Sequence, residues 1–594
     1  MFKKFLPFLN WFPISRQVLH ADLIAGISVA LILVPQSMAY AQLAGLPPYH
    51  GLYASFLPVM IAALFGSSKQ LATGPVAVVS LLTASALMPM AGLGTEQFVA
   101  LAILLALIVG LVQLALGVFK LGVVVNFLSH PVILGFTNAA AIIIALSQVS
   151  KIFGVEMQKS ESFLSDIWGV LQQIDQTHFP TLIFGIIALG MMHYLNKKYP
   201  KIPNILAAVA LTTLLSWIIG FEDLGGRVVG EIPRGLPGLS FPDISFDTFF
   251  QLLPIAVVIS LVGFMEAISV AKSVASKTRE RLDPNQELIG QGLANIVGSF
   301  GQAYPASGSF SRTAINYKAG AQTGMSSVFT ALAVLITIIL LTPLLYHLPQ
   351  AVLAAVIIVA VQGLIHFKSA LHAWRANRHD GIAALVTFVA TLGFAPHLDK
   401  GIMAGAGLAM GMYLYRTMRP RVAHLGRYED GTLRDLKLHP DLPTDERIIV
   451  VRYDGELYFA NVSYFEETIL AAVSEKTESK WLLIMGHGIN ELDASGEVVL
   501  HHLVERLREN KITMVFSGLK PQVLRVMQRT KLFDNIGSEN IFPTTSMALA
   551  GIYERIGDNQ FCPLMLPMTQ ESEPDDYPEE KEAQEPETSA ESIS

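Results

Sequence analysis

The stretch "AYPASGSFSRTAINYKAG" at residues 303–320 decides the fold, because small residues and one arginine interrupt a long apolar region there. A glycine and three serines precede a short helical pattern, and Arg312 lies where that helix would begin. "ATGPVAVVSLL" at residues 72–82 is interrupted in the same way, with Gly74 and Pro75 ahead of an apolar helix. Proline suits the first turn of a helix. Each stretch therefore predicts a short helix that starts partway across a membrane.

The composition indicates a membrane protein. Of 594 residues, 52% are hydrophobic and 15% are charged, whereas about 25% of the residues of a soluble domain are charged. Apolar runs recur between residues 20 and 418, and roughly 20 apolar residues suffice to cross a bilayer. The single cysteine, Cys562, excludes an internal disulfide and a multi-cysteine metal site, and we expect no cofactor. We predict a polytopic α-helical membrane protein with a soluble C-terminal part.

Fourteen spans account for the apolar runs, and the distribution of basic residues supports them. Lysines and arginines near the ends of spans mark the cytoplasmic side of a membrane. If the chain crosses the membrane at each of these spans, most of its basic loop residues lie on the same side as the N-terminus, for example Lys197, Lys277 and Arg416. We therefore expect a cell (inner) membrane protein with both termini in the cytoplasm. The predicted spans are residues 21–41, 50–65, 74–89, 98–118, 126–148, 179–195, 203–220, 250–275, 286–301, 308–319, 324–345, 349–365, 381–395 and 399–417.

The two interrupted stretches occupy matching positions, as the third span of a first set of seven and the third of a second set. Interrupted spans at corresponding positions of two halves indicate an inverted-repeat transporter with a binding site near the midplane. Helix starts inside the bilayer direct free N–H groups and positive dipole ends at one point. Arg312 would add a planar cationic donor, which predicts an anion site. The alternative is an arginine that extends to the lipid headgroups.

The eighth span carries another intramembrane charge, Glu266 in "LVGFMEAISVAKS" at residues 261–273. Ionisable residues inside a span are functional candidates. We predict that Glu266 takes up and releases the proton that drives transport. The alternative is a fixed counter-charge to Arg312 or Lys272.

Four segments resemble the SulP family of sulfate permeases, the bacterial relatives of the solute carrier 26 anion transporters. They are "VPQSMAYAQLAGLPPYHGLYASFLP" at 34–58, "LATGPVAVVSLL" at 71–82, "LSHPVILGFTNAAAI" at 128–142 and "QELIGQGLANIVGSFGQAYPASGSFSRTAINYKAGAQTG" at 286–324. With the C-terminal domain, the resemblance covers residues 18 to 556. It implies two inverted seven-span repeats, as in uracil-type transporters. It also implies a core of spans 1–4 and 8–11 that moves against a gate of spans 5–7 and 12–14, in a homodimer.

The resemblance further implies which residues bind the anion. For Gln36 and Tyr40, hydrogen bonding between helices is the other explanation. Sodium-coupled bicarbonate relatives have an Asp and a Thr one turn apart in the eighth span. This chain has Glu266 and Val270 at those places, which counts against a sodium site. The implied anion-binding residues are Gln36, Tyr40, Val76, Ala77, Val78, Ser311 and Arg312.

Strands and helices alternate beyond Arg421, as in "RIIVVRYD", "KWLLIMG" and "SGEVVLHHLVERLREN", which predicts a small α/β domain. "LDASG" at residues 492–496 resembles the strand-to-helix loop of a STAS domain. That family often has a phosphorylatable Ser or Thr after the aspartate, whereas this chain has Ala494, followed by Ser495 as a weak substitute. The predicted parts are a cytoplasmic N-terminus (1–20), a transporter domain (21–418), a linker (419–445), a STAS domain (446–556) and an acidic tail (557–594) whose composition indicates disorder.

Together these features predict a secondary active transporter that imports an inorganic oxyanion, with sulfate first, by proton symport. No Gly-Lys dipeptide occurs, so the chain has no P-loop for ATP hydrolysis. Importing a divalent anion against 100 mV costs about 4.6 kcal/mol, twice the single-charge value. Electroneutral sulfate uptake therefore needs about two cations. Glu266 accounts for one proton, and the sequence identifies no second carrier.

Several other functions stay open on the sequence alone. Bicarbonate or a C4-dicarboxylate could be the substrate of the same fold. A passive anion channel, or a membrane-tethered sensor with the STAS domain as its output, are further alternatives. No metal-ligand cluster or nucleophile–base motif supports an enzyme, and nothing in the sequence indicates nucleic-acid binding. The expected partners are sulfate, protons, membrane lipid and a second copy of the chain.

Overall fold

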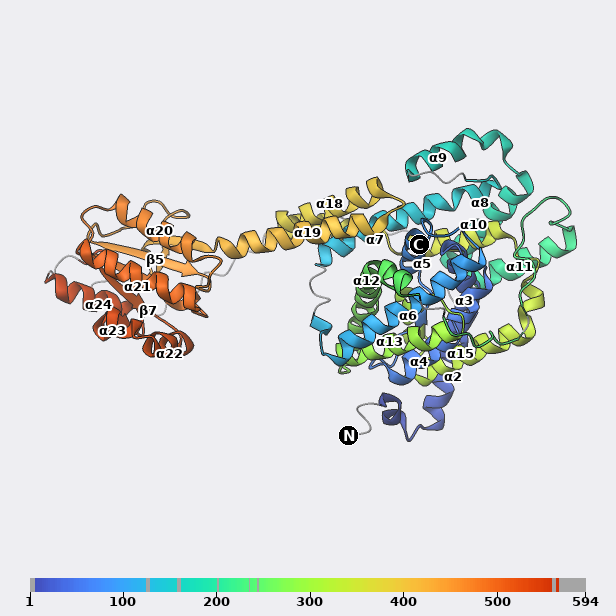
Figure 1. The fold of residues 1–594 in the computed structure, drawn as a ribbon, viewed down its shortest axis with the longest axis horizontal. Helices are drawn as coiled ribbons and strands as arrows, with labels where there is room; N and C mark the ends of the chain where they lie inside the picture. Colours follow the sequence, from blue (N-terminus) through green and yellow to red (C-terminus); the bar gives the residue numbers. More distant parts are fainter. Residues whose placement is uncertain are drawn as a thin grey trace, which may run out of the picture. The chain divides into compact units, whose positions relative to one another are not determined.

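The computed structural model describes residues 6–123, 129–157, 162–199, 202–233, 235–242, 245–557 and 562–565. The chain divides into two compact units, residues 1–411 and 412–594, which Figure 1 draws in the colours of the sequence. The acidic tail for which we predicted disorder lies outside the described residues, apart from Gly557 and residues 562–565.

The described residues of the first unit form helices and two short strands, which pair with each other. In the described part of the chain, seven helical stretches are long and apolar enough to cross a membrane. The helices are η1 Pro7–Trp11, α2 Arg16–Leu43, α3 Tyr49–Ala54, α4 Leu57–Phe65, α5 Ala77–Leu87, α6 Glu96–Val118, α7 His130–Ser147, α8 Val149–Phe153, α9 Phe163–Gln172, η3 Ile174–Gln176, α10 Phe179–Lys198, α11 Asn204–Ile219, α12 Phe246–Thr278, α13 Pro284–Phe300, α14 Phe310–Lys318, α15 Met325–Ile336, η4 Thr337–Leu341, η5 Thr342–Leu345, α16 Gln350–Gln362, α17 Phe367–Ala376, α18 Arg378–Phe394 and α19 Leu398–Met418.

Each predicted span coincides with one helix or with consecutive short helices. The second span is divided into α3 and α4, and the eleventh passes from α15 through the π-helical segment η4. The start of the fifth span, residues 126–128, lies outside the described residues. The helices α9 and α17 were not predicted, because their apolar residues are too few to form a span. The number of membrane crossings stays a prediction.

Capping residues explain where several helices begin. The Ser15 hydroxyl accepts a hydrogen bond from Val18 N at the start of α2, and Thr95 caps α6 in the same way. Asp283 directly precedes Pro284, the first residue of α13, and accepts bonds from the backbone N–H groups of Asn285 and Gln286. Such side chains satisfy N–H groups that have no partner within the helix. The helix starts are therefore encoded locally.

Small residues allow α6 and α13 to approach closely. A Cβ on Gly292 would lie 2.6 Å from the backbone nitrogen of Leu114, and one on Gly110 would lie 2.7 Å from the Gly292 oxygen. Membrane helices commonly meet at such residues, because packing replaces the hydrophobic driving force between them. This contact fixes α13 against its neighbour.

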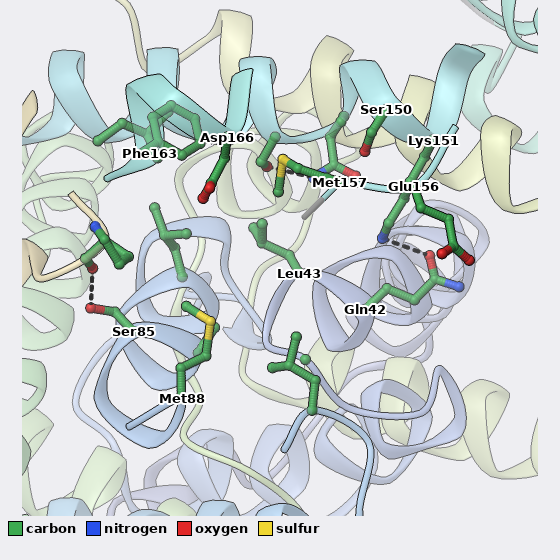
Figure 2. Close-up of a pocket in the computed structure, with 18 of the residues that line it drawn as sticks. Gln42, Leu43, Ser85, Met88, Ser150, Lys151, Glu156, Met157, Phe163 and Asp166 are labelled. Carbon is green, nitrogen blue, oxygen red and sulfur yellow. Dashed lines mark hydrogen bonds between the residues drawn. The ribbon is translucent and has the colours of Figure 1, made fainter. Parts of the chain in front are cut away.

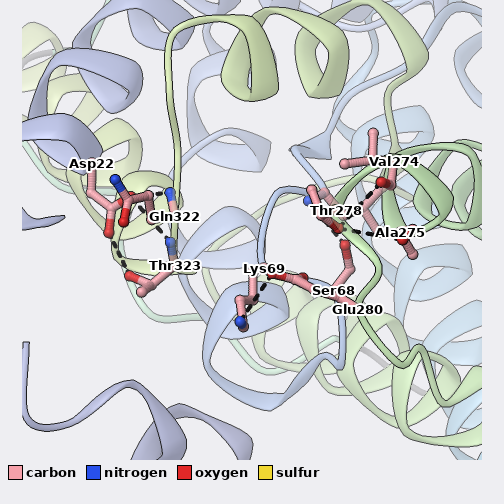
Figure 3. A network of polar contacts seen from close by, with 10 residues as sticks. Asp22, Ser68, Lys69, Val274, Ala275, Thr278, Glu280, Gln322 and Thr323 are labelled. Atoms are coloured by element: carbon pink, nitrogen blue, oxygen red, sulfur yellow. Dashed lines mark hydrogen bonds and ion pairs between the residues drawn. The ribbon is translucent and has the colours of Figure 1, made fainter.

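Polar contacts near the predicted cytoplasmic ends tie the first unit together (Figure 3). The fully buried carboxylate of Asp22, in α2, accepts bonds from the backbone nitrogens of Gln322 and Thr323 at 2.7 and 3.1 Å. An ion pair at 3.0 Å joins Lys69, after α4, to Glu280, after α12. These contacts join segments of the two sequence halves.

The second unit is an α/β domain around a six-stranded sheet. Its strand order is β4-β3-β5-β6-β7-β8, parallel from β5 to β8 and antiparallel elsewhere. One face packs on α20 to α23 and the other on α24. The elements are β3 Arg421–Arg427, β4 Leu433–Asp435, β5 Ile448–Asp454, α20 Val462–Glu475, β6 Trp481–Met485, η6 Gly486–Gly488, α21 Ala494–Glu509, β7 Thr513–Ser517, α22 Pro521–Arg529, α23 Leu532–Ile536, η7 Ser538–Asn540, β8 Ile541–Phe542 and α24 Thr545–Ile556.

The segment predicted as a linker contributes strands to the sheet. Both β3 and β4 lie in the segment predicted as a linker, residues 419–445, so the structure places that segment in the sheet. Asp445 lies at the end of this segment. Burial raises its pKa, but bonds from Arg447 and Tyr553 outweigh the effect of burial and hold that pKa below its usual range.

The loop that resembles the strand-to-helix loop of a STAS domain begins α21. Asp493 caps this helix by accepting a bond from Gly496 N at 2.8 Å, and Ala494 is exposed. The loop thus has an ordinary capping role.

Candidate functional site

The two interrupted stretches meet in the structure. Strand β1 (Thr73–Gly74) pairs antiparallel with β2 (Ser307–Gly308), and α5 and α14 begin directly after these strands. Gly74 adopts a φ of +141°, which side chains other than glycine rarely adopt. The expected juxtaposition of two helix starts, from opposite halves of the sequence, is therefore present.

A cavity of about 280 Å³ lies at the starts of α5 and α14. It is bounded by core helices on one side and by residues of α7 and α16 on the other. The free N–H groups and positive dipole ends of both helices favour an anion at such a place. Six of the eight predicted site residues line this cavity, namely Tyr40, Val76, Ala77, Val78, Glu266 and Ser311.

Gln36 and Arg312 do not line the cavity; they are buried together beside it. Arg312 is fully buried, and its Nη1 donates a hydrogen bond to Gln36 Oε1 at 3.1 Å. The other side-chain donors, Nε and Nη2, are buried without a hydrogen-bond partner. The alternative in which Arg312 extends to lipid headgroups is wrong, because its side chain has no exposed surface. The arginine instead places a fixed positive charge inside the core.

Glu266 comes from the middle of α12 and is half-buried at the cavity wall, one turn before Ser269. Among the described residues, neither Arg312 nor Lys272 forms an ion pair with it within 4.0 Å. No direct ion pair therefore supports the alternative in which Glu266 is a fixed counter-charge. Val270 is buried, as expected for an apolar residue at that place.

A polar stripe on α13 holds both interrupted stretches in place. Glu287 accepts bonds from the backbone nitrogens of Ser67 and Ser68, which precede β1, at 2.8 and 2.9 Å. Gln291 donates to Thr73 Oγ1 at 2.8 Å. Asn295 donates to the oxygen of Ala306 and accepts from its nitrogen, at 3.0 and 2.8 Å, just before β2. The three side chains share one face of the helix, since they are four residues apart.

Sequence reasoning missed this stripe, although its spacing was visible in "QELIGQGLANIVGS". It also missed His130 and His366, which line the cavity from the gate side. His130 was part of a family-like segment but carried no further signal, and His366 follows the end of a predicted span. Neither position points to a cavity without the tertiary contacts.

A second cavity, of about 390 Å³, lies at the other end of α5 (Figure 2). The Ser85 hydroxyl, near the end of α5, donates to the oxygen of Pro396 and accepts from Leu398 N at 3.4 Å. Lys151 Nζ donates to Gln42 Oε1 at 3.4 Å. These contacts join core helices to gate segments. The two cavities therefore lie at opposite ends of one 11-residue helix.

Comparison with protein families assigns both units. The sequence pattern of the sulfate permease family matches residues 19–387, and that of the STAS domain matches residues 439–548. The sulfate transporter 4.1, chloroplastic, of Arabidopsis thaliana is 36% identical over 555 residues, which cover 90% of this chain and 81% of the relative. The probable sulfate transporter 4.2 of the same plant is 37% identical over 544 residues, covering 89% and 80%.

Solved structures share the fold. The murine solute carrier 26 family member A9 anion transporter in the inward-facing state superposes with a TM-score of 0.85 at 24% identity, over 93% of this chain and 94% of that chain. The transmembrane domain of a cyanobacterial bicarbonate transporter gives a TM-score of 0.57 at 24% identity, over 66% of this chain and 98% of that domain. The predicted combination of this transmembrane fold with a C-terminal STAS domain is confirmed.

Proposed function

Because this chain belongs to the sulfate permease family and is an anion transporter of that family, we propose that it imports sulfate by proton symport through the cavity at the starts of α5 and α14. The observation that carries the proposal is one cavity lined by two helix starts and one carboxylate, Glu266. The names of its plant relatives support sulfate as the anion.

The surroundings of the cavity favour an oxyanion. Ala77 and Val78 belong to the first turn of α5, and Phe310 and Ser311 to the first turn of α14. Helix first turns present N–H groups without intrahelical acceptors, and the dipoles add partial positive charge. Buried Arg312 contributes a full charge behind this wall. Sulfate would therefore be bound by backbone donors and hydroxyls, with the arginine acting through its field.

Glu266 would couple the anion to a proton. In its ionised form the carboxylate repels a dianion in the same cavity, and in its neutral form it can donate a hydrogen bond. Anion binding and proton binding then favour each other by the same factor, because the coupling between two sites is reciprocal. This supports symport of at least one proton with each sulfate.

The cavities at the two ends of α5 support alternating access. By the distribution of basic residues, the anion cavity lies on the cytoplasmic side and the second cavity on the opposite side. The contacts of Ser85 with Pro396 and Leu398 join core to gate at that opposite side, so they must break before sulfate can enter. We extend the proposal to a homodimer in the cell (inner) membrane, with cytoplasmic termini and lipid around it.

The Glu266→Gln variant tests proton coupling. We expect an inward proton gradient to stimulate uptake of radiolabelled sulfate into proteoliposomes at least about tenfold less in this variant than in wild type, because a neutral amide cannot release a proton. Sulfate exchange without a gradient should persist, since the amide resembles the protonated carboxyl. The measurement is initial uptake with and without the gradient.

Glu280→Gln is the matched control, because Glu280 pairs with Lys69 and does not line the cavity. It should respond to the gradient as wild type does. A full gradient response of Glu266→Gln would contradict the coupling role. Competition by bicarbonate or succinate in the same assay tests the substrate, and currents far above the uptake rate would indicate a channel.

A further inference from the structure

Two histidines form part of the gate-side wall of the anion cavity. His130 is the first residue of α7, and His366 lies between α16 and α17. Both are exposed residues, and both line the cavity. Among the described residues that line the cavity, the other titratable side chains are Tyr40 of α2 and Glu266 of α12, and the rest are uncharged.

The position of His366 is fixed by a specific contact. Asn138, a buried residue of α7, accepts a hydrogen bond from His366 N at 2.7 Å. The Asn138 amide also donates to the Leu134 oxygen at 2.7 Å. The segment after α16 is therefore tied to α7, the helix that carries His130. The segment that carries His366 and the helix that carries His130 therefore form one wall of the cavity.

The charges around the cavity leave a role for these histidines. A sulfate ion carries two negative charges, whereas Arg312, a cationic side chain that lies beside the cavity, is buried and bonded to Gln36. Glu266 removes one unit of repulsion when it is protonated. Histidine changes its charge between pH 5 and 8, so an imidazole at the wall can attract a dianion at one pH and lose that attraction at another.

We propose that His130 and His366 are additional anion-binding residues, which hold a divalent oxyanion while they are protonated and the cavity is open on their side. The inference rests on the proposed function of this cavity. Because both histidines belong to the gate, they affect the release and rebinding of the anion at the cytoplasmic side.

Equilibrium binding of radiolabelled sulfate to the purified full chain between pH 6 and 8 tests this inference. The background is Glu266→Gln, which removes the pH dependence of the carboxylate. In the Glu266→Gln variant we expect the affinity for sulfate to fall about tenfold from pH 6 to pH 8. A change of about tenfold is typical of the coupling between two binding sites, here those for the proton and for sulfate. With His130→Gln and His366→Gln added, affinity should be low and nearly independent of pH. An unchanged pH dependence would overturn the inference.

A fixed charge separates binding from folding. His366→Lys, added to Glu266→Gln, should keep high affinity for sulfate at pH 8, where Glu266→Gln alone has lost it. Low affinity of this variant at both pH 6 and pH 8 would contradict the role of the charge. His193→Gln, in α10 and outside the cavity lining, is the matched control and should follow its parent. If wild type binds no sulfate at pH 6, the proposed function itself fails, which is distinct from sulfate binding that ignores the histidines.

Discussion

Replacing Arg312 with glutamine is expected to weaken sulfate binding by at least about 100-fold, which corresponds to about 2.7 kcal/mol. The arginine is fully buried beside the anion cavity. The structure records one hydrogen bond of its guanidinium, which Nη1 donates to Gln36 Oε1. A charge in a poorly solvated place acts over a longer range than one in water. The field that attracts the anion should therefore collapse in this variant. Binding of radiolabelled sulfate to purified protein measures the effect.

Arg312→Lys separates charge from geometry. It keeps the positive charge but loses the planar donor that reaches Gln36, so it should retain part of the affinity, about tenfold below wild type. Both variants must elute in detergent with the profile of folded protein, because a buried arginine side chain also contributes packing contacts. Wild-type affinity in Arg312→Gln would remove this arginine from the binding mechanism.

The Asn295→Leu variant is expected to lower the free energy of unfolding by about 3 kcal/mol and to abolish uptake. Its amide bonds Gln113 Oε1 and both backbone groups of Ala306. A buried donor or acceptor left without a partner costs about 1–3 kcal/mol. Ala306 directly precedes β2, so the loss should also displace the start of α14 and with it the anion site. Thermal unfolding and sulfate uptake measure the two effects.

Asn285→Leu provides the control on the same helix. The Asn285 side chain accepts one bond, from Gly122 N at 3.0 Å, close to the start of α13. It should cost about 1 kcal/mol, as expected for a single hydrogen bond, and leave uptake in place. Equal stability losses in both variants would show that the α13 stripe has no special role in supporting β1 and β2.

The local features of this protein were readable from its residues. Gly74 and Pro75, and the serines around Gly308, indicated interrupted helices, and the structure has a short strand and a helix start at each place. Tyr40, Val76 and Glu266 line the expected cavity, although their roles stay predictions. Helix breakers, caps and apolar runs act within a few residues, so one stretch of sequence is enough to recognise them.

The sequence by itself therefore determined the class of protein, the places where helices begin and break, and the division into a membrane part and an α/β domain. Only the tertiary structure decided that Arg312 turns toward Gln36, 276 residues away, and not into the cavity. It also decided that the stripe on α13 supports both strands and that His130 and His366 share one wall. These choices depend on which buried groups find partners across the packed helices, and no local pattern encodes such pairings.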